Sequence, residues 1–173
     1  MKELKNPTLI VICGWAVCGK GTIAKKVAKK LKVHWLDIDE IRVLNFGLPN
    51  PYPNVSAEAM ERDRKEMKGS YELLYSAINS MLSMKRSLIV TATFSRASYW
   101  NEIIDSLKNY PDYQCKIIWC KPINDTEEEI KRRLKKRIFG ANCYSSVNSI
   151  ERYREVKARY EQTKLPHLEL NTS

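Results

Sequence analysis

Short, continuously apolar runs alternate with longer amphipathic segments along this chain. Residues 8–13 (Thr-Leu-Ile-Val-Ile-Cys) are apolar almost throughout, which is typical of a strand buried on both faces of a parallel sheet. Residues 88–93 and 115–120 have the same character, and residues 33–37 and 167–170 are shorter strand candidates. Strands that alternate with helices favour an α/β architecture, in which helices cover both faces of a parallel sheet.

The segments between these runs carry apolar residues at helical spacing. They predict five helices, whose buried faces are, in chain order, Ile23, Ala24, Val27, Ala28 and Leu31; Met67, Tyr71, Leu74, Ile78 and Leu82; Trp100, Ile103, Ile104 and Leu107; Ile130, Leu134 and Ile138; and Ile150, Tyr153, Val156 and Tyr160. We expect the second helix to begin near Ser56 and the fourth to be capped by Asp125, with Glu128 in the capping-box position. Prolines exclude helix from residues 48–54, so this segment is predicted to be a loop of a kind that often borders a ligand site.

Size and composition narrow the class of protein. At 173 residues, the chain is expected to form one domain over residues 1–173. No apolar run approaches the roughly 18–20 residues of a membrane span, and five cysteines without a metal-binding spacing suggest reduced thiols in a cytoplasmic protein. Lys and Arg number 30 against 20 for Asp and Glu, and the net charge of +10 indicates an anionic partner: a nucleotide, a phosphorylated substrate or nucleic acid.

The turn between the first predicted strand and the first helix has the strongest chemical signature in the sequence. It reads Gly14-Trp15-Ala16-Val17-Cys18-Gly19-Lys20-Gly21-Thr22. Glycines let the backbone wrap an anion, the helix N-terminus adds positive potential, and Lys20 supplies a charge for the β- and γ-phosphates. A strand before this motif and a helix after it are the context of a P-loop, so we expect these residues to bind the phosphates of ATP.

Asp37 and Asp39 follow the second predicted strand, at the end where open α/β sheets bind their ligands. A carboxylate there can accept the proton of an attacking hydroxyl group. Arg42, three residues after Asp39, projects from the same side of the first helical turn and is placed to hold an anionic group of the acceptor. The competing interpretation is structural: an aspartate that caps a helix, with a surface arginine beside it.

The fourth predicted helix is strongly basic, since residues 131–137 read Lys-Arg-Arg-Leu-Lys-Lys-Arg. Arg133 and Arg137 lie four residues apart beside the apolar stripe, and guanidinium groups in that position can neutralise the charge of a phosphoryl group in transfer. The alternative is a solvated helix held by (i, i+4) ion pairs. If Glu129 pairs with Arg133, Arg137 is the better candidate for a lid over the site, and we place this lid at about residues 125–145.

The P-loop followed by Asp37-x-Asp39-x-x-Arg42 resembles the P-loop kinase group that includes bacteriophage polynucleotide kinase, chloramphenicol phosphotransferase and zeta-toxin-like kinases. Residues 91–96 (Thr-Ala-Thr-Phe-Ser-Arg) are similar to the Asp-Ala-Thr-Phe segment after the third strand of that family, and the Arg-rich helix resembles its lid. The resemblance implies a three-layer P-loop NTPase fold with a five-stranded parallel sheet and a small helical lid. It also implies that Asp39 is the general base and that Arg42 contacts the acceptor.

Two positions depart from the usual pattern. Gly21 stands where most P-loops carry the serine or threonine whose hydroxyl touches Mg²⁺, and Thr91 stands where the family usually has a Walker-B-like aspartate. Gly-Lys-Gly-Thr instead resembles adenylate kinase and related nucleotide kinases, which hold the ion largely through water. We therefore expect no direct protein ligand to the metal: either Asp37, Asp39 and Thr22 organise a hydrated Mg²⁺, or catalysis is weak.

The residues and the resemblance together predict a kinase that uses ATP and Mg²⁺. The expected roles are catalysis for Lys20, Asp39 and Arg137, substrate binding for Asp37, Arg42 and Arg96, and nucleotide binding for the P-loop residues and Arg133. The γ-phosphoryl group would pass to a hydroxyl or phosphate acceptor, which is a polynucleotide end or a small molecule. Two alternatives stay open: a nucleoside monophosphate kinase, favoured by Gly-Lys-Gly-Thr and disfavoured by Asp39-x-x-Arg42, and a nucleotide-binding module with little turnover, favoured by the missing Mg²⁺ supports.

Overall fold

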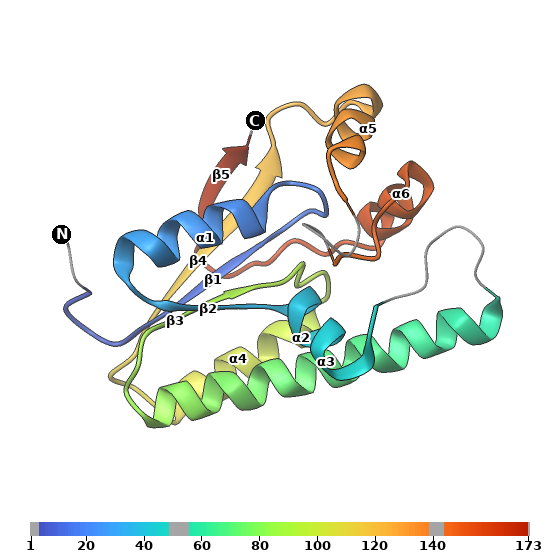
Figure 1. The fold of residues 1–173 in the computed structure, drawn as a ribbon. Helices are drawn as coiled ribbons and strands as arrows, with labels where there is room; N and C mark the ends of the chain where they lie inside the picture. Colours follow the sequence, from blue (N-terminus) through green and yellow to red (C-terminus); the bar gives the residue numbers. More distant parts are fainter. Residues whose placement is uncertain (1–3, 49–55, 139–143, 173) are drawn as a thin grey trace.

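The computed structural model describes residues 4–48, 56–138 and 144–172 of the chain. Within these ranges, strands and helices alternate along the sequence (Figure 1). The elements, in chain order, are β1 (Thr8–Gly14), α1 (Lys20–Leu31), β2 (His34–Asp37), α2 (Ile38–Phe46), α3 (Ala57–Ser83), β3 (Leu88–Thr91), α4 (Ala97–Lys108), β4 (Gln114–Pro122), α5 (Glu127–Lys135), α6 (Ile150–Ala158) and β5 (Leu168–Thr172). No helix in the described ranges has both the length and the apolar character needed to cross a membrane.

The strands form one parallel sheet in the order β2-β3-β1-β4-β5, so β1 lies at its centre. Leu9 of β1 is level with Leu88 of β3 on one side and with Cys115 of β4 on the other. The carboxyl ends of the strands therefore share one edge of the sheet, from which the P-loop, α2 and the β3–α4 loop all depart (Figure 1). The five-stranded parallel sheet predicted from the sequence is confirmed.

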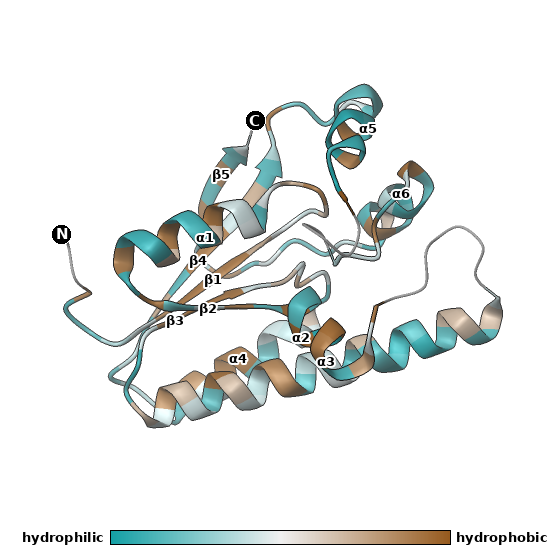
Figure 2. Cartoon of the chain, viewed as in Figure 1, coloured by the Kyte–Doolittle hydropathy of each residue, from teal (hydrophilic) through white to brown (hydrophobic). Residues whose placement is uncertain are grey.

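Helices cover both faces of the sheet, as the continuously apolar strands predicted. Leu9, Val11 and Cys13 of β1 belong to the core cluster that includes α3 and α4. Ile10 and Ile12 belong to the opposite cluster, against α1. Successive side chains of a strand point to opposite faces, so a central strand with helices on both sides needs apolar residues at every position. Figure 2 shows these apolar residues concentrated in the central strands.

The helices α5 and α6 lie beyond the carboxyl edge of the sheet (Figure 1). Ile130 of α5 and Val156 of α6 are buried against Ala16 and Val17, two residues of the P-loop. The region predicted as a lid therefore packs directly on the loop that it was expected to cover, although its residues 139–143 lie outside the described part of the chain.

The predicted fourth helix differs from the observed one at both ends. Thr126, and not Asp125, caps α5, because its side chain accepts a hydrogen bond from the backbone N–H of Glu129. Asp125 instead accepts a hydrogen bond from the Tyr153 hydroxyl at 2.5 Å. At the other end, α5 stops before Ile138, whose side chain is 64% exposed and not part of a buried stripe.

Two further boundaries follow from local geometry. The side chain of Ser56 caps α3 through a backbone hydrogen bond of 3.2 Å, so the predicted start of this helix is confirmed. β3 ends at Thr91, two residues earlier than predicted, and the chain turns at Phe94, where φ is 48°. The predicted loop over residues 48–54 lies, except for Leu48, outside the described residues.

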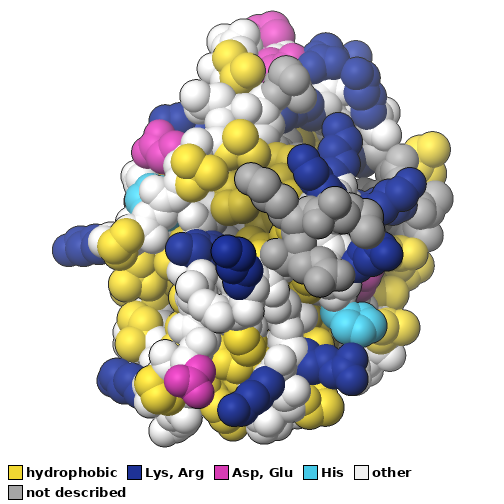
Figure 3. All heavy atoms as spheres, turned by 90° about the vertical axis from the view of Figure 1, so that its left-hand side faces the viewer, with side chains coloured by type: hydrophobic (Ala, Val, Ile, Leu, Met, Phe, Trp, Pro, Cys, Tyr) yellow, Lys and Arg dark blue, Asp and Glu magenta, His cyan; other side chains and the backbone are white. Residues whose placement is uncertain are grey.

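Basic side chains are not confined to the carboxyl edge of the sheet. Figure 3 shows the side of the molecule that lies to the left in Figure 1, away from the P-loop, and Lys and Arg side chains are spread over that face as well. The net charge of +10 is therefore distributed over the molecule. Net charge alone does not locate the anionic partner, so the site must be found from individual groups.

Candidate active site

The residues predicted to bind phosphate form the connection between β1 and α1. Gly14 and Gly19 have φ angles of 127° and 82°, in the region that favours glycine. A Cβ atom on Gly14 would lie 2.0 Å from the carbonyl oxygen of Cys120, because the loop passes close to β4 here. Val17 also has a positive φ, of 63°. When the backbone changes between right-handed and left-handed conformations in this way, successive N–H groups can face one anion.

Most side chains of this loop pack inward. Ala16, Val17 and Cys18 are buried, so their contribution to phosphate binding would come from backbone N–H groups. Gly19 is the N-cap of α1 and has no side chain to satisfy the first N–H groups of the helix. These groups and the positive end of the helix dipole are thereby left for an anion.

Lys20 is the first residue of α1, and its ammonium group reaches back over the loop. Its Nζ donates to the carbonyl oxygens of Gly14 at 3.1 Å and Trp15 at 2.7 Å. Burial alone would raise the pKa of the Cys18 thiol, but a hydrogen bond with Cys120 and the positive charge of Lys20 lower it. Lys20 thus places a positive charge at the centre of the predicted phosphate cradle.

The aspartate that caps α2 is Asp37 and not Asp39. It is the N-cap of α2, where its Oδ1 accepts a hydrogen bond from the backbone N–H of Asp39 at 2.9 Å. Its Oδ2 accepts one from the hydroxyl of Thr91 at 2.5 Å. Asp37 and Thr91 are paired in register on the neighbouring strands β2 and β3, which places the Asp37 carboxylate beside Thr91.

Asp39 is free of the capping role and lies half-buried in the first turn of α2. Burial and the neighbouring Asp37 carboxylate raise the pKa of Asp39 to about 6, against the opposing charges of Lys20, Arg137 and Arg42. A carboxyl group with this pKa is ionised at neutral pH and still has a useful affinity for a proton, as a general base requires. Lys20 and Arg137, the other two residues predicted to be catalytic, therefore act electrostatically on Asp39.

Arg42 is buried between α2 and α3, with 1% of its side chain exposed, so it is not a surface arginine. Its Nη2 lies 2.7 Å from Asp63 Oδ1 and 2.7 Å from Glu66 Oε2. Its Nη1 is buried and has no hydrogen-bond partner among the described residues. In this arrangement the charge of Arg42 is taken up by two carboxylates of α3, and the residue ties α2 to α3.

Arg42→Met should therefore lower the stability of the protein more than a typical surface substitution. Removing the buried partner leaves Asp63 and Glu66 with their longer contacts to Arg152 and Arg62, at 3.3 Å and 3.5 Å. We expect this to cost about 3 kcal/mol, or about 6–12 °C in Tm for a chain of this size. The matched control is Arg62→Met, because Arg62 contacts the same Glu66 at 3.5 Å but is 60% exposed. We expect that control to change stability by at most about 0.5 kcal/mol. Thermal unfolding measures both effects. Equal Tm shifts for the two variants would exclude a special stabilising role of buried Arg42 between α2 and α3.

The two predicted lid arginines have different partners. Arg133 donates to Glu129 at 2.7 Å, as the (i, i+4) alternative predicted, and also to the carbonyl oxygens of Val17 at 3.5 Å and Thr172 at 2.8 Å. It thereby joins α5 to the P-loop and to the end of β5. Arg137 follows α5 and donates to the carbonyl oxygen of Val147 at 3.1 Å. The expectation that both arginines lie on one helix is wrong, because α5 has already ended.

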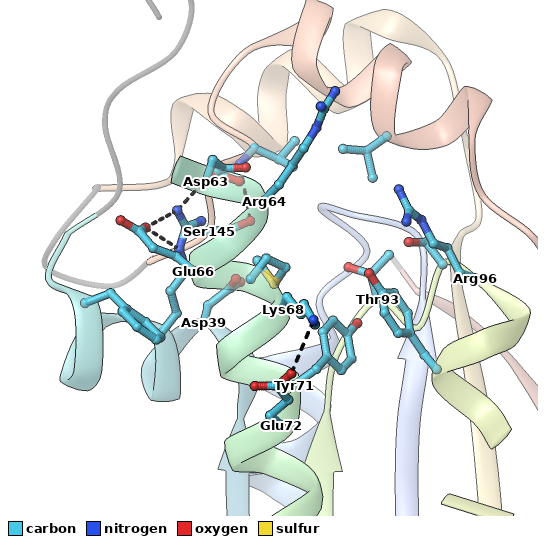
Figure 4. Close-up of a pocket in the computed structure, with 18 of the residues that line it drawn as sticks. Asp39, Asp63, Arg64, Glu66, Lys68, Tyr71, Glu72, Thr93, Arg96 and Ser145 are labelled. Atoms are coloured by element: carbon cyan, nitrogen blue, oxygen red, sulfur yellow. Dashed lines mark hydrogen bonds and ion pairs between the residues drawn. The ribbon is translucent and has the colours of Figure 1, made fainter. Parts of the chain in front are cut away.

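A cavity of about 1360 Å³ opens beside Asp39, between α2, α3, the β3–α4 loop and α6. Figure 4 shows Asp39 and Arg96 on different sides of this cavity, with Tyr71 and Thr93 between them. Of the three residues predicted to be catalytic, Asp39 is the one that lines it, and no P-loop residue is among the described residues of its wall. The predicted substrate residues Arg42 and Arg96 also line it. Asp39 thus connects the phosphate cradle to a space large enough for an acceptor.

Several charged residues of this cavity were missed in the sequence. Asp63 and Glu66 hold Arg42, and Arg152 and Arg159 reach the cavity from α6 and its C-cap. The spacing of Asp63 and Glu66, three residues apart on one helix, was the only local hint. Their partners come from other elements, so only the packing of α2, α3 and α6 brings these groups together.

Comparison with known proteins agrees with this architecture. The sequence pattern of the AAA domain family matches residues 9–163. No curated protein matches the chain. Among solved structures, a candidate kinase from Chloroflexus aurantiacus j-10-fl is 21% identical, with a TM-score of 0.69 over 97% of this chain and 88% of that one.

Two further structures belong to proteins with named activities. The Mycobacterium tuberculosis APS kinase CysC, in complex with AMPPNP and APS, is 16% identical, with a TM-score of 0.60 over 96% of this chain and 88% of that one. A gluconokinase from Sinorhizobium meliloti 1021 is 14% identical, with a TM-score of 0.60 over 98% of this chain and 85% of that one. At these identities the similarity concerns the fold, which is the P-loop NTPase α/β fold.

Proposed function

The chain belongs to the AAA domain family, and from this premise we propose that it is an ATP-dependent phosphotransferase that moves the γ-phosphoryl group of ATP to a hydroxyl acceptor. The observation that carries the proposal is the position of Asp39. It is a half-buried carboxylate with a raised pKa that interacts electrostatically with the positive charges of Lys20 and Arg137. It also lines the cavity.

The nucleotide would bind with its phosphates in the P-loop. Backbone N–H groups of residues 14–20 and the N-terminus of α1 would surround the phosphates, and Lys20 would exchange its carbonyl partners for the β- and γ-phosphates. Arg133 would keep the loop in shape through the Val17 carbonyl rather than touch the phosphates itself. Arg137 would supply the second positive charge, because its field already reaches Asp39.

The reaction would use the cavity side of Asp39. An acceptor hydroxyl in the cavity would give its proton to the Asp39 carboxylate while its oxygen forms a bond to the γ-phosphorus. The bond between the γ-phosphorus and the β,γ-bridging oxygen breaks, ADP leaves, and the proton passes from Asp39 to solvent. Lys20 and Arg137 would offset the charge on the transferring group, which is the main contribution that a P-loop kinase makes to the rate.

The residues around Asp37 fit a hydrated Mg²⁺. Asp37 presents two oxygens beside Asp39, each with one hydrogen bond and a remaining lone pair, and Thr91 holds the carboxylate in place. We propose that Asp37, Asp39 and Thr22 organise the water ligands of the ion. When bound there, the hydrated ion would supply positive charge that offsets the negative charge developing on the transferring phosphoryl group.

Gly21→Ser should lower the Mg²⁺ concentration needed for half-maximal turnover. A Cβ on Gly21 would lie 3.7 Å from the Trp35 ring, which is ordinary contact, and the position is within α1, so serine fits and brings the missing hydroxyl. Gly21→Ala adds the same Cβ without a hydroxyl and is the control. Thr91→Asp is expected to give no such gain, because its carboxylate would face that of Asp37 in place of a 2.5 Å hydrogen bond. A parent-like Mg²⁺ dependence for Gly21→Ser would show that metal binding does not limit the rate.

The function is tested by measuring ADP formation with and without a panel of hydroxyl acceptors. A kinase releases ADP in proportion to the phosphorylated acceptor formed, and phosphorus NMR identifies the new ester. The second candidate is a nucleotide-binding module with little turnover, which Gly21 and Thr91 favour at the two usual positions of metal support. Tight ATP binding without acceptor-dependent formation of ADP would favour the nucleotide-binding module.

A further inference from the structure

Most basic side chains that line the cavity are already neutralised. The paired ones are Arg42, Arg62, Arg64, Lys68 and Arg152, each within 4.0 Å of a carboxylate. The other two, Arg96 and Arg159, have no ion pair within the part of the chain that the structure describes. An arginine without a carboxylate partner on the wall of a cavity is available to an anionic ligand.

These two arginines belong to segments that are fastened together. Arg96 is the N-cap of α4, and Arg159 is the C-cap of α6. Glu161, just after Arg159, accepts a hydrogen bond from the Ala97 N–H at 2.8 Å, and its own N–H donates to the Ser95 carbonyl at 3.0 Å. The α6 end and the β3–α4 loop are therefore held side by side, and both arginines face one cavity.

The charges around Arg159 are unbalanced. Burial, and then the positive charges of Arg152 and Arg96, lower the pKa of Arg159. Glu155 and Tyr99 act in the opposite direction, but Arg152 already holds Glu155 at 2.8 Å. Like charges gathered in this way repel one another, and a bound anion would remove the repulsion.

The loop that carries Arg96 is held in an unusual conformation. Phe94 has a φ of 48° although it is not glycine, and its side chain is fully buried between Tyr71 and Trp100, with ring centroids 5.7 Å and 4.9 Å away. Its N–H donates to the Tyr71 hydroxyl at 3.3 Å. A strained residue persists where its surroundings fix it, so the backbone two residues before Arg96 is held in place at the cavity wall.

We propose that the acceptor carries a phosphate group in addition to its reacting hydroxyl, and that Arg96 and Arg159 bind this phosphate across the cavity from Asp39. This inference rests on the proposed function, because it concerns the acceptor of that reaction. Asp39 and Arg96 lie on different sides of a cavity of about 1360 Å³, so the phosphate and the hydroxyl belong to separate parts of the acceptor (Figure 4). A phosphorylated metabolite and a nucleic-acid end share this chemistry.

The test compares matched acceptors with and without phosphate: adenosine and AMP, glucose and glucose 6-phosphate, and a short single-stranded oligonucleotide with free hydroxyl ends. We expect the phosphate-bearing compounds to be phosphorylated on a hydroxyl group with the lower KM. Arg96→Gln and Arg159→Gln should each raise that KM by about tenfold or more, with a smaller effect on kcat. Arg64→Gln is the control, because Arg64 lines the same cavity but pairs with Glu61. KM values for adenosine and glucose should not respond to these substitutions.

Salt separates the two sources of phosphate. Binding of a nucleic-acid strand weakens steeply between about 50 and 200 mM salt, with a slope near the number of neutralised phosphates, whereas a small phosphate ester gives a shallow response. Equal use of neutral and phosphorylated acceptors, or transfer of the phosphoryl group to the phosphate of AMP, would overturn the inference and leave the kinase assignment standing.

Calorimetric binding of AMP and glucose 6-phosphate keeps the inference testable if no acceptor is turned over. Binding that weakens in Arg96→Gln and Arg159→Gln but not in Arg64→Gln would support the phosphate site even though the proposed function had failed. Absence of any such arginine-dependent binding, together with absence of turnover, would remove both.

Discussion

Lys20→Ala is expected to raise the Kd for ATP by about 10–100-fold while the fold stays intact. Hydrogen bonds from a charged group to a phosphate contribute about 1.5–3 kcal/mol each, and alanine offers none. In the structure, Lys20 Nζ donates to the loop carbonyl groups of Gly14 and Trp15. Alanine removes these two hydrogen bonds, and we expect little change in the packing of the protein. Alanine is also a strong helix former, which suits the first turn of α1.

Isothermal titration with ATP and Mg²⁺ measures this effect, and thermal unfolding checks the fold. Lys26→Ala is the control, because Lys26 is an exposed residue of the same helix and its removal changes the net charge equally. If Lys20→Ala and Lys26→Ala bind ATP as tightly as the parent, the loop between β1 and α1 does not hold the phosphates.

Asp39→Asn should lower kcat by about 10²–10⁴ with little change in ATP affinity. The amide keeps the shape of the side chain but cannot accept the proton of the attacking hydroxyl. Glu40→Gln is the matched control, because Glu40 is the next residue of α2, is exposed, and does not line the cavity. Small and equal effects of the two substitutions would exclude Asp39 as the base.

The pH dependence of kcat gives an independent test of the same residue. Burial and the Asp37 carboxylate raise the pKa of Asp39 from 3.8 to about 6. A base is active when ionised, so kcat of the parent should be half-maximal near pH 6, level off about one pH unit above it, and fall about tenfold per pH unit well below it. Asp39→Asn should lose this acidic limb. A parent profile that is flat down to about pH 4 would mean that Asp39 is not the titrating group.

The phosphate cradle and the sheet were open to prediction because their causes are local. A strand with helices on both sides must be apolar at every position, and β1 shows this directly. Gly14 and Gly19 mark backbone geometry that other residues rarely adopt, and Lys20 follows at fixed spacing. Asp39 was found for the same reason, since it follows β2 at the edge where ligands bind.

Other features depend on partners that are distant in the sequence. From the sequence, Arg42 could be interpreted as a surface residue or as an anion-binding residue. The structure shows that it forms ion pairs with Asp63 and Glu66 of α3. Thr91 looked like the loss of a metal support, but the pairing of β2 with β3 sets its hydroxyl against Asp37.

The sequence alone therefore determined the five strands, the phosphate-binding loop and the acidic residue beside it, because periodicity and backbone geometry act over a few residues. Of the helices in the described residues, α2 was not among the five whose buried faces the sequence predicted. The tertiary structure decided which charges are neutralised and which stay available. The partners of Arg42 lie 21 and 24 positions along the chain, and those of Arg96 and Arg159 are absent from the described cavity wall. Coulomb interactions depend on distance in space, and only the packing of α3, α6 and the β3–α4 loop sets those distances.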